Sequence, residues 1–276
     1  MLYLRKAQAA RPPAVAAKKG VRALKKLLCA ALAASLGFAC AACAQESGGL
    51  FASSRPDSVE SAELQFQTPA ADAPAAVIRT SLGSITVVLY PQYAPLAVEN
   101  FTGLAQQGYN DGLVFHRVDH DFVIQTGDAT GTGASCATVW DDEPFPNEVT
   151  GLLRHYAGAL ATANADASQG NLSQFYIVSA PAGSVDADAA DTLLSAGLSE
   201  DAASTYRQAG GAPYLDGLDT VFGQVVDGMD VVDAINAVET DENSRPLEDV
   251  TVLSVTVTTF GQAGAIAAES TPESAA

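Results

Sequence analysis

Positive charge is scarce over most of this 276-residue chain. Beyond Lys26 there is no lysine, and six arginines stand against 32 acidic residues, which gives that stretch a formal net charge of −26. A surface of this sign repels nucleic acid and anionic lipid headgroups. We therefore expect no nucleic-acid partner.

Cysteine is equally scarce. The four residues are Cys29, Cys40, Cys43 and Cys136. Only Cys136 lies beyond the N-terminal apolar run, so a folded domain would hold one thiol and no internal disulfide. The spacings fit neither a zinc ligand set nor a redox pair. His116 and His120 are four residues apart, but their segment is predicted to be strand, turn and strand, so they would not converge on a metal. We expect no metal site.

The N-terminus has the features of an export signal. All eight basic residues up to Lys26 precede an alanine-rich apolar run that ends at Ala44, and no acidic residue lies among them. This order is typical of a signal peptide. Small residues before Cys43 favour a bacterial lipoprotein signal, with cleavage before Cys43 and lipidation of its thiol, although the usual leucine three residues earlier is missing.

Two alternatives stay open at this end of the chain. Ordinary signal peptidase could cleave after Ala44, which would give a secreted protein. An uncleaved membrane anchor is disfavoured because the run is rich in alanine and short for a span. The favoured prediction is residues 1–43 as a signal peptide, with the exported protein held on the outer face of the cytoplasmic membrane by a lipid on Cys43.

Composition also divides the rest of the chain. Residues 44–74 are rich in serine, alanine, proline, glycine and acids, which predicts a flexible linker. Residues 261–276 are predicted to be a disordered tail for the same reason. The remaining span, 75–260, has the length of one domain.

Within that span the patterns predict many strands and few helices. Apolar alternation at 76–80 and 84–89 predicts a hairpin. Pro95 is suited to a first helical turn, and an apolar stripe continues that helix to Gly108. Further strands are expected at 112–118, 122–125, 174–178, 220–225 and 250–258, with a short helix at 230–237. The set favours a mainly β fold, of the kind that closes into an antiparallel barrel.

The most informative segment is Phe115 to Asp128, which reads FHRVDHDFVIQTGD. It is followed in order by LSQFYI at 172–177, LDG at 215–217 and VFG at 221–223, and it is preceded by APLAVENF at 94–101. Together these segments resemble the cyclophilins over roughly Ala75 to Thr259. The resemblance implies a closed eight-stranded antiparallel barrel capped by two helices, and peptidyl-prolyl cis/trans isomerase activity.

The resemblance also implies the site. Arg117 would donate to the prolyl group and stabilise the twisted amide, Gln125 would hold the substrate backbone and orient Arg117, and Phe122 would seat the proline ring. The wider substrate site would comprise His116, Val123, Asn164, Ala165, Gln174, Tyr176, Tyr214, Leu215 and Asp219. No cofactor is implied. The expected partners are proline-containing polypeptides, bound by a monomer.

Several departures from the family pattern affect the pocket. Tyr214 stands where many cyclophilins have a tryptophan associated with cyclosporin binding, so weaker inhibition by that drug is expected. Asp219 replaces a common pocket histidine, and its charge would disfavour acidic substrates. A second function class stays open, in which the groove captures proline-containing segments as a chaperone or scaffold module with little turnover.

A long insertion separates two parts of the expected pocket. It spans Ser179 to Gly211 and has helix-compatible spacing at 191–196 and 200–208, with a break at Gly197. We expect a helical excursion that either borders the groove or merely elaborates the surface. Its aspartates superficially suggest a calcium loop, but the required glycine and terminal glutamate are absent at the proper places.

Overall fold

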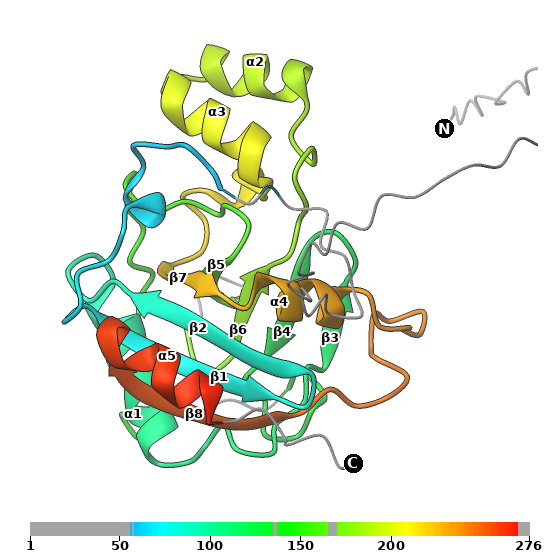
Figure 1. Cartoon of the computed structure of the whole chain (residues 1–276). Helices are drawn as coiled ribbons and strands as arrows, with labels where there is room; N and C mark the ends of the chain where they lie inside the picture. Colours follow the sequence, from blue (N-terminus) through cyan, green and yellow to red (C-terminus); the bar gives the residue numbers. More distant parts are fainter. Residues whose placement is uncertain (1–55, 57, 135–136, 165–169, 270–276) are drawn as a thin grey trace, which may run out of the picture. The chain divides into compact units, whose positions relative to one another are not determined.

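A computed structural model describes residues 56, 58–134, 137–164 and 170–269 (Figure 1). The predicted signal peptide and Cys43 lie outside this part of the chain, as do Cys136 and Ala165. The described residues form one antiparallel sheet of eight strands in the order β3-β4-β6-β5-β7-β2-β1-β8. The strands are β1 (Pro74–Thr80), β2 (Gly83–Leu89), β3 (Arg117–Asp119), β4 (Val123–Thr126), β5 (Ala159–Thr162), β6 (Phe175–Val178), β7 (Val221–Asp227) and β8 (Val252–Thr259).

The expected mainly β fold of eight antiparallel strands is confirmed, and the sheet curls until its two edges meet. The edge strands β3 and β8 are joined through the segment that precedes β3. There Val114 bridges Thr251, and the backbone N–H of Phe115 donates to the carbonyl of Val250 at 2.9 Å. Val114 and Thr251 form only an isolated bridge, because the predicted strand at 112–118 becomes a regular β-strand only at Arg117. Strand β5 was missed altogether, since its sequence ALAT carries little strand signal.

Of the helices in the described residues, two were expected as caps and two fall in the insertion, where helices were also expected, so only the one at the C-terminal end was not predicted. The helices are α1 (Pro95–Gln106), α2 (Ala187–Ser195), α3 (Glu200–Ala209), α4 (Met229–Asn236) and α5 (Phe260–Ala268), with short 3-10 turns η1 (Leu64–Phe66) and η2 (Pro213–Leu215). Helix α1 begins with Pro95 and no side-chain cap of its own. Instead the Glu148 carboxylate accepts hydrogen bonds from the free N–H groups of Leu96 and Ala97 at 3.1 and 3.0 Å. Among the described residues no helix is long and apolar enough to span a membrane.

Strand alternation sorts the side chains into two buried layers. On β4 and β6, Ile124 pairs with Ile177 and both belong to the core inside the curled sheet, together with Phe101 and Phe222. Their neighbours along the strands point to the opposite face, because successive side chains in a strand alternate. That opposite face holds Val123, Tyr176 and Val178 in a second cluster. The candidate site therefore lies on the outer face of a sheet whose inner face is fully packed.

The insertion forms a helical hairpin, as predicted. Asp186 caps α2 and Ser199 caps α3, each by accepting a hydrogen bond from a backbone N–H three residues later. Gly197 lies between the two helices and has a φ of +98°, a backbone conformation that favours glycine. The pair has an apolar cluster of its own, in which Tyr156 and Tyr206 pack with ring centroids 4.4 Å apart.

The predicted flexible linker is wrong for residues 58–73. Gln65 is buried, and its amide nitrogen donates to the Arg154 carbonyl at 2.9 Å and to the Gln224 side chain at 2.8 Å, while its oxygen accepts from the Arg154 N–H at 2.7 Å. A polar side chain that pairs with backbone gives no apolar periodicity in the sequence. This segment therefore packs against the domain without the apolar periodicity that predicts a folded segment.

The predicted disordered tail is also wrong over its first part. Helix α5 occupies Phe260 to Ala268 and lies against β1 and β2, with Ala263 buried. The Arg79 guanidinium donates to the Ile266 carbonyl at 3.0 Å. Alanine has the highest helix propensity, so a segment rich in it can form a helix once a sheet supports it. The folded domain thus extends beyond both predicted limits.

Candidate active site

Three neighbouring strands bring the predicted catalytic residues together. Arg117 on β3 pairs with Gln125 on β4, which pairs in turn with Tyr176 on β6. Residues directly opposite one another in antiparallel strands have Cβ atoms about 5 Å apart and point to the same face. The row crosses the floor of a cleft of about 420 Å³ on the outer face of the sheet.

Arg117 is oriented by contacts on two sides. One terminal nitrogen donates to the Gln125 side-chain oxygen at 3.2 Å, and the other donates to an Asp119 carboxylate oxygen at 2.7 Å. The guanidinium carbon lies 5.7 Å from the centre of the Phe122 ring. These two hydrogen bonds occupy two of the five N–H groups of an arginine. Because 37% of the side chain is exposed, the others remain accessible to a ligand.

Gln125 belongs to a chain of amides. Its oxygen accepts from Arg117, and its nitrogen donates to the Gln174 oxygen at 3.0 Å. The Gln174 nitrogen then donates to the Gly133 carbonyl at 2.9 Å. Each amide acts as donor and acceptor, so the orientation of every member is fixed by the next. The Arg117 guanidinium is therefore connected through Gln125 and Gln174 to Gly133, which also lines the cleft.

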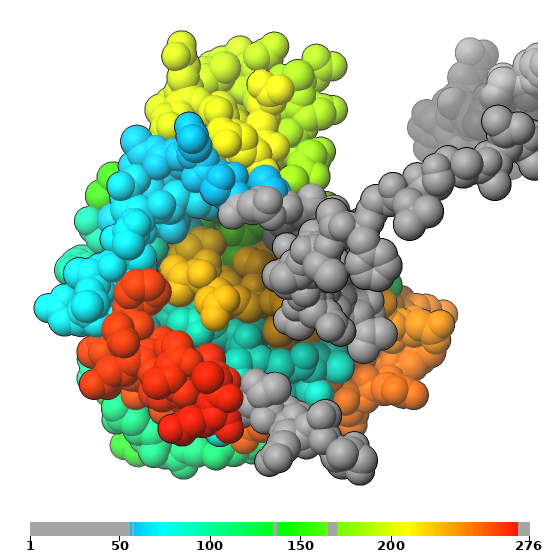
Figure 2. Space-filling view, viewed as in Figure 1, coloured from blue at the N-terminus to red at the C-terminus, as the bar shows by residue number. Residues whose placement is uncertain are grey.

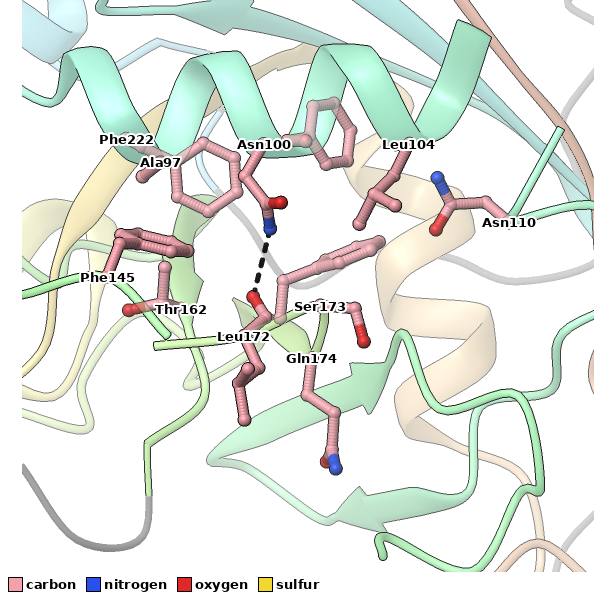
Figure 3. A pocket seen from close by; sticks show the side chains of 12 residues that line it. Ala97, Asn100, Leu104, Asn110, Phe145, Thr162, Leu172, Ser173, Gln174 and Phe222 are labelled. Atoms are coloured by element: carbon pink, nitrogen blue, oxygen red, sulfur yellow. Dashed lines mark hydrogen bonds between the residues drawn. The ribbon is translucent and has the colours of Figure 1, made fainter. Parts of the chain in front are cut away.

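The segment that carries Gln174 is anchored from beneath by helix α1. Figure 3 shows Asn100 reaching from this helix to the Leu172 carbonyl, and the hydrogen bond is 3.2 Å long. The Asn100 oxygen accepts from the N–H of Val139 at 3.0 Å. The cavity between them is only about 10 Å³, about one water-sized probe sphere. It supports the site but is too small for an organic ligand.

An apolar wall adjoins the polar row. Phe122, Val123, Tyr176 and Leu215 line the cleft, and Val123 and Tyr176 are themselves almost fully buried. The Tyr214 ring lies 5.8 Å from that of Phe122 and is 65% exposed, so it extends the wall toward solvent. The apolar wall and the Arg117 donor together suit a prolyl residue, whose ring carbons are apolar and whose amide is polar.

Asp219 is paired within the cleft. The Tyr176 hydroxyl donates to its carboxylate at 2.8 Å. Burial raises the pKa of Asp219 above its ordinary value, while the Tyr176 hydrogen bond and nearby His155 act in the opposite direction. Burial, followed by the charge of Asp219, raises the pKa of Tyr176, so the tyrosine stays protonated and remains the donor.

The other predicted residues mostly line the same cleft. His116, Asn164 and Gln174 do so, whereas Ala165 lies outside the described residues. His116 is buried, and burial lowers its pKa, although the charge of Asp128 and a hydrogen bond with Gln174 oppose that shift. A largely neutral imidazole suits a pocket wall better than a second cation would. Among the described residues no group of three or more histidine, cysteine or acidic side chains could hold a metal ion.

One loop of the cleft was not predicted. Thr132 and Gly133 line the cleft opposite Arg117, along with Ala163 and Asn243. The loop is organised by Asp128, whose carboxylate accepts from the N–H groups of Thr130 at 2.8 Å, Thr132 at 2.9 Å, and Gly133. Burial alone would raise the pKa of Asp128, but these hydrogen bonds lower it below its ordinary value. The run of glycine and threonine after Asp128 was the available signal for such a turn.

The comparisons with known proteins agree with this geometry. A family model described as "Cyclophilin type peptidyl-prolyl cis-trans isomerase/CLD" matches residues 75–257. Peptidyl-prolyl cis-trans isomerase ppi1 of Schizosaccharomyces pombe is 37% identical over 177 residues, which are 64% of this chain and 94% of that protein.

Two further similarities concern a longer relative and a solved structure. A Streptococcus pyogenes protein, whose name combines a phosphatase with a peptidyl-prolyl cis-trans isomerase, is 41% identical over 202 residues, which are 71% of this chain but only 42% of that relative. The crystal structure of a Cryptosporidium parvum cyclophilin type isomerase has a TM-score of 0.55 at 23% identity and covers 68% of this chain and 98% of its own. The family match and the curated relatives, together with the shared fold, establish that this chain belongs to the cyclophilin family of peptidyl-prolyl cis-trans isomerases.

Proposed function

We propose that this cyclophilin acts on exported proteins and that Arg117 lowers the barrier to rotation of the Xaa-Pro bond by stabilising the twisted amide. The observation that carries this proposal is the position of the guanidinium. It lies between Gln125 and the Phe122 ring, in a cleft that has an apolar wall for the proline. A capture module would need the wall but not an oriented cationic donor beside it.

The reaction requires only electrostatics and positioning. Rotation about the bond before proline meets a barrier of roughly 18–20 kcal/mol because the amide is stabilised by resonance. When the amide twists, resonance is lost and the lone pair returns to the imide nitrogen, which then accepts a hydrogen bond. An arginine stays charged at any working pH and can donate at that moment. Stabilising the twisted state by about 5 kcal/mol would accelerate rotation several thousandfold.

Each part of the cleft has a role in this scheme. Phe122, Val123, Tyr176 and Leu215 hold the proline ring, so that the ring stays fixed while the preceding residue rotates. Gln125 orients Arg117 and binds the substrate backbone. Backbone groups near Asn164 pair with the peptide on the other side.

The test is isomerisation of a short Ala-Pro peptide, followed by NMR exchange, with a chain that starts at Ser47 so that the segment around Gln65 is retained. The proposal expects strong acceleration that is lost in Arg117→Ala. Peptide binding with little acceleration by the unaltered chain would instead support the capture-module alternative. Equal acceleration by the two chains would refute the role of Arg117.

The exported setting rests on the N-terminal sequence. Eight basic residues, an apolar run and Cys43 favour a lipid anchor on the outer face of the cytoplasmic membrane. There the domain would meet proline-containing clients as they fold, and as a monomer it would use this single cleft. In bacterial cells, the full chain should incorporate radiolabelled palmitate and sediment with membranes. Cys43→Ser should lose the label, and labelling that persists would contradict lipidation at this residue.

A further inference from the structure

We propose that Asp216 is a positioning residue for the proline pocket, and that helix α3 of the insertion acts on the reaction through it. This inference rests on the isomerase site described above and assigns a role to the insertion. The link is a hydrogen bond between Tyr206 on α3 and Asp216, which adjoins the pocket residue Leu215.

Asp216 is the centre of a buried cluster. The Tyr206 hydroxyl lies 2.8 Å from each carboxylate oxygen. The backbone N–H and Nδ1 of His155 lie 2.9 and 3.1 Å from one oxygen, and a terminal nitrogen of Arg154 lies 3.3 Å from the other. Tyr206 and His155 are almost completely buried. Donors from two separate parts of the chain therefore meet on one carboxylate.

The cluster touches the pocket on two sides. Asp216 follows Leu215 and precedes Asp219 by three residues, and both of these line the cleft. The His155 ring stacks on the Tyr176 ring at 6.2 Å and 24°, and Tyr176 donates to Asp219. The contacts form a closed ring from Asp216 through His155, Tyr176 and Asp219 back along the chain. The floor and one wall of the pocket are consequently fixed relative to each other.

The insertion is itself held in place, so it can support that ring. An Asp201 carboxylate oxygen accepts from the N–H of Ala62 at 3.0 Å, and the hydroxyls of Thr205 and Ser61 lie 2.6 Å apart. Figure 2 shows the segment that contains Ser61 and Ala62, in blue, lying against the α3 part of the insertion, in yellow. Arg154 also pairs with Glu63 of the same segment at 3.7 Å. Segment and insertion together form a layer behind the pocket.

Removing the Tyr206 hydroxyl should change how firmly the pocket residues are positioned. Without the Tyr206 hydroxyl, Asp216 keeps only the donors of residues 154 and 155, and the loop that carries Leu215 loses this side-chain hydrogen bond to α3. Small displacements of groups that position a substrate can cost up to about a hundredfold in rate. The lost hydrogen bond ends on a carboxylate, and hydrogen bonds to charged groups contribute about 1.5–3 kcal/mol. If about 1 kcal/mol of that loss reaches the twisted-amide state, the rate falls about fivefold. An insertion that only elaborated the surface would leave the activity unchanged.

The experiment compares two hydroxyl deletions on the same helix. Tyr206→Phe removes the contact with Asp216, whereas the control Ser204→Ala removes an exposed hydroxyl that meets the Gln208 side chain and leaves the pocket connection intact. Both proteins are assayed under conditions in which circular dichroism shows them folded. We expect Tyr206→Phe to lower kcat/KM by about fivefold, through both kcat and KM, and to shift the NMR signals of Tyr176 and Leu215. Ser204→Ala should stay within about twofold of the unaltered chain.

The inference would be overturned if the two variants had equal kcat/KM and equal Tyr176 signals. The readouts also separate this result from failure of the proposed mechanism. If Arg117→Ala retained full activity, the arginine mechanism would fail, but the comparison of Tyr206→Phe with Ser204→Ala would still decide the role of Asp216. If no acceleration were seen at all, the same pair would be compared by titration with a proline peptide, where weaker binding by Tyr206→Phe alone would support the positioning role and equal binding would refute it.

Discussion

Two arginine–aspartate pairs lie close to the cleft and differ in what surrounds them. Arg117 and Asp119 are joined at 2.7 Å, and their side chains are 37% and 42% exposed. Arg154 and Asp216 are joined at 3.3 Å, and both side chains are 18% exposed. The first pair has few other partners, whereas the second is surrounded by His155, Tyr206 and Glu63.

The difference shows how one chemical pair can serve two purposes. An exposed pair contributes little to folding, because water solvates both charges in either state. Its arginine is therefore available to a substrate. A buried pair is costly to break, because removing one partner leaves the other desolvated. We expect substitutions in the first pair to change activity with little change in stability, and substitutions in the second to change stability first.

The largest effect should come from Arg117→Ala. Loss of an oriented donor to a developing charge typically costs about 10²–10³ in rate, and we expect a loss of that order in kcat/KM for an Ala-Pro peptide. The free energy of unfolding should change by less than about 0.5 kcal/mol, since the side chain is partly exposed. Arg207→Ala, an exposed arginine on α3, is the control and should leave kcat/KM unchanged. A large stability loss in Arg117→Ala would contradict the contrast between the two pairs.

Asp216→Ala should have the largest effect on stability. It removes the acceptor shared by Arg154, His155 and Tyr206, and breaking such a buried pair costs about 3 kcal/mol. Asp119→Ala, the matched change in the exposed pair, should cost less than about 1 kcal/mol. Urea unfolding followed by circular dichroism measures both. Equal losses would show that burial does not distinguish the pairs.

Arg117 and Gln125 were predicted from the sequence, whereas the Arg154–Asp216 pair was not. Arg117 and Gln125 lie in one short segment whose strand spacing places them opposite each other, and the family resemblance implies the roles proposed for them. Arg154 and His155 reach Asp216 from 62 and 61 positions away in the chain, and nothing local in the sequence predicts such contacts. The packing of the segment around Gln65 was not predicted for a related reason, because its partners are backbone groups contributed by another loop.

The Arg154–Asp216 pair should also make stability depend on pH. Burial would raise the pKa of Asp216, but hydrogen bonds from His155 and Tyr206 lower it below its ordinary value of 3.8. The unfolded chain then binds a proton more readily than the folded one, so this contribution is complete above about pH 4 to 5 and is lost as the pH falls through the lowered pKa. Asp128, whose pKa is also lowered, should act in the same direction.

Denaturant titrations between pH 6 and pH 2.5 test this dependence. The unaltered chain should lose stability steadily below about pH 4. Asp216→Asn should be less stable at pH 6 but should lose less on acidification, because the titrating group is gone. Parallel curves for the unaltered chain and Asp216→Asn would show that this carboxyl does not govern the acid transition.

The smallest expected effect concerns a third carboxylate, Asp219, which has no arginine partner among the described residues and pairs instead with Tyr176. Its charge should favour a cationic residue next to the proline. At separations near 8 Å in a wet cleft, two charges interact by roughly 0.5 kcal/mol, so kcat/KM for an Arg-Pro peptide relative to a Gln-Pro peptide should be raised about two- to threefold at pH 8.

Asp219→Asn keeps the shape of the side chain and removes its charge, so this preference should disappear while the rate for Gln-Pro stays nearly the same. Because burial raises the pKa of Asp219, the preference of the unaltered chain should weaken at a higher pH than an exposed aspartate would allow. Arginine stays protonated throughout, so the peptide does not contribute to that change. If the variant keeps the preference, the same assay on Asp119→Asn tests whether that carboxylate is its source. If it is, the partner of Arg117 would shape specificity as well, and the exposed pair would have a second function that the buried pair lacks.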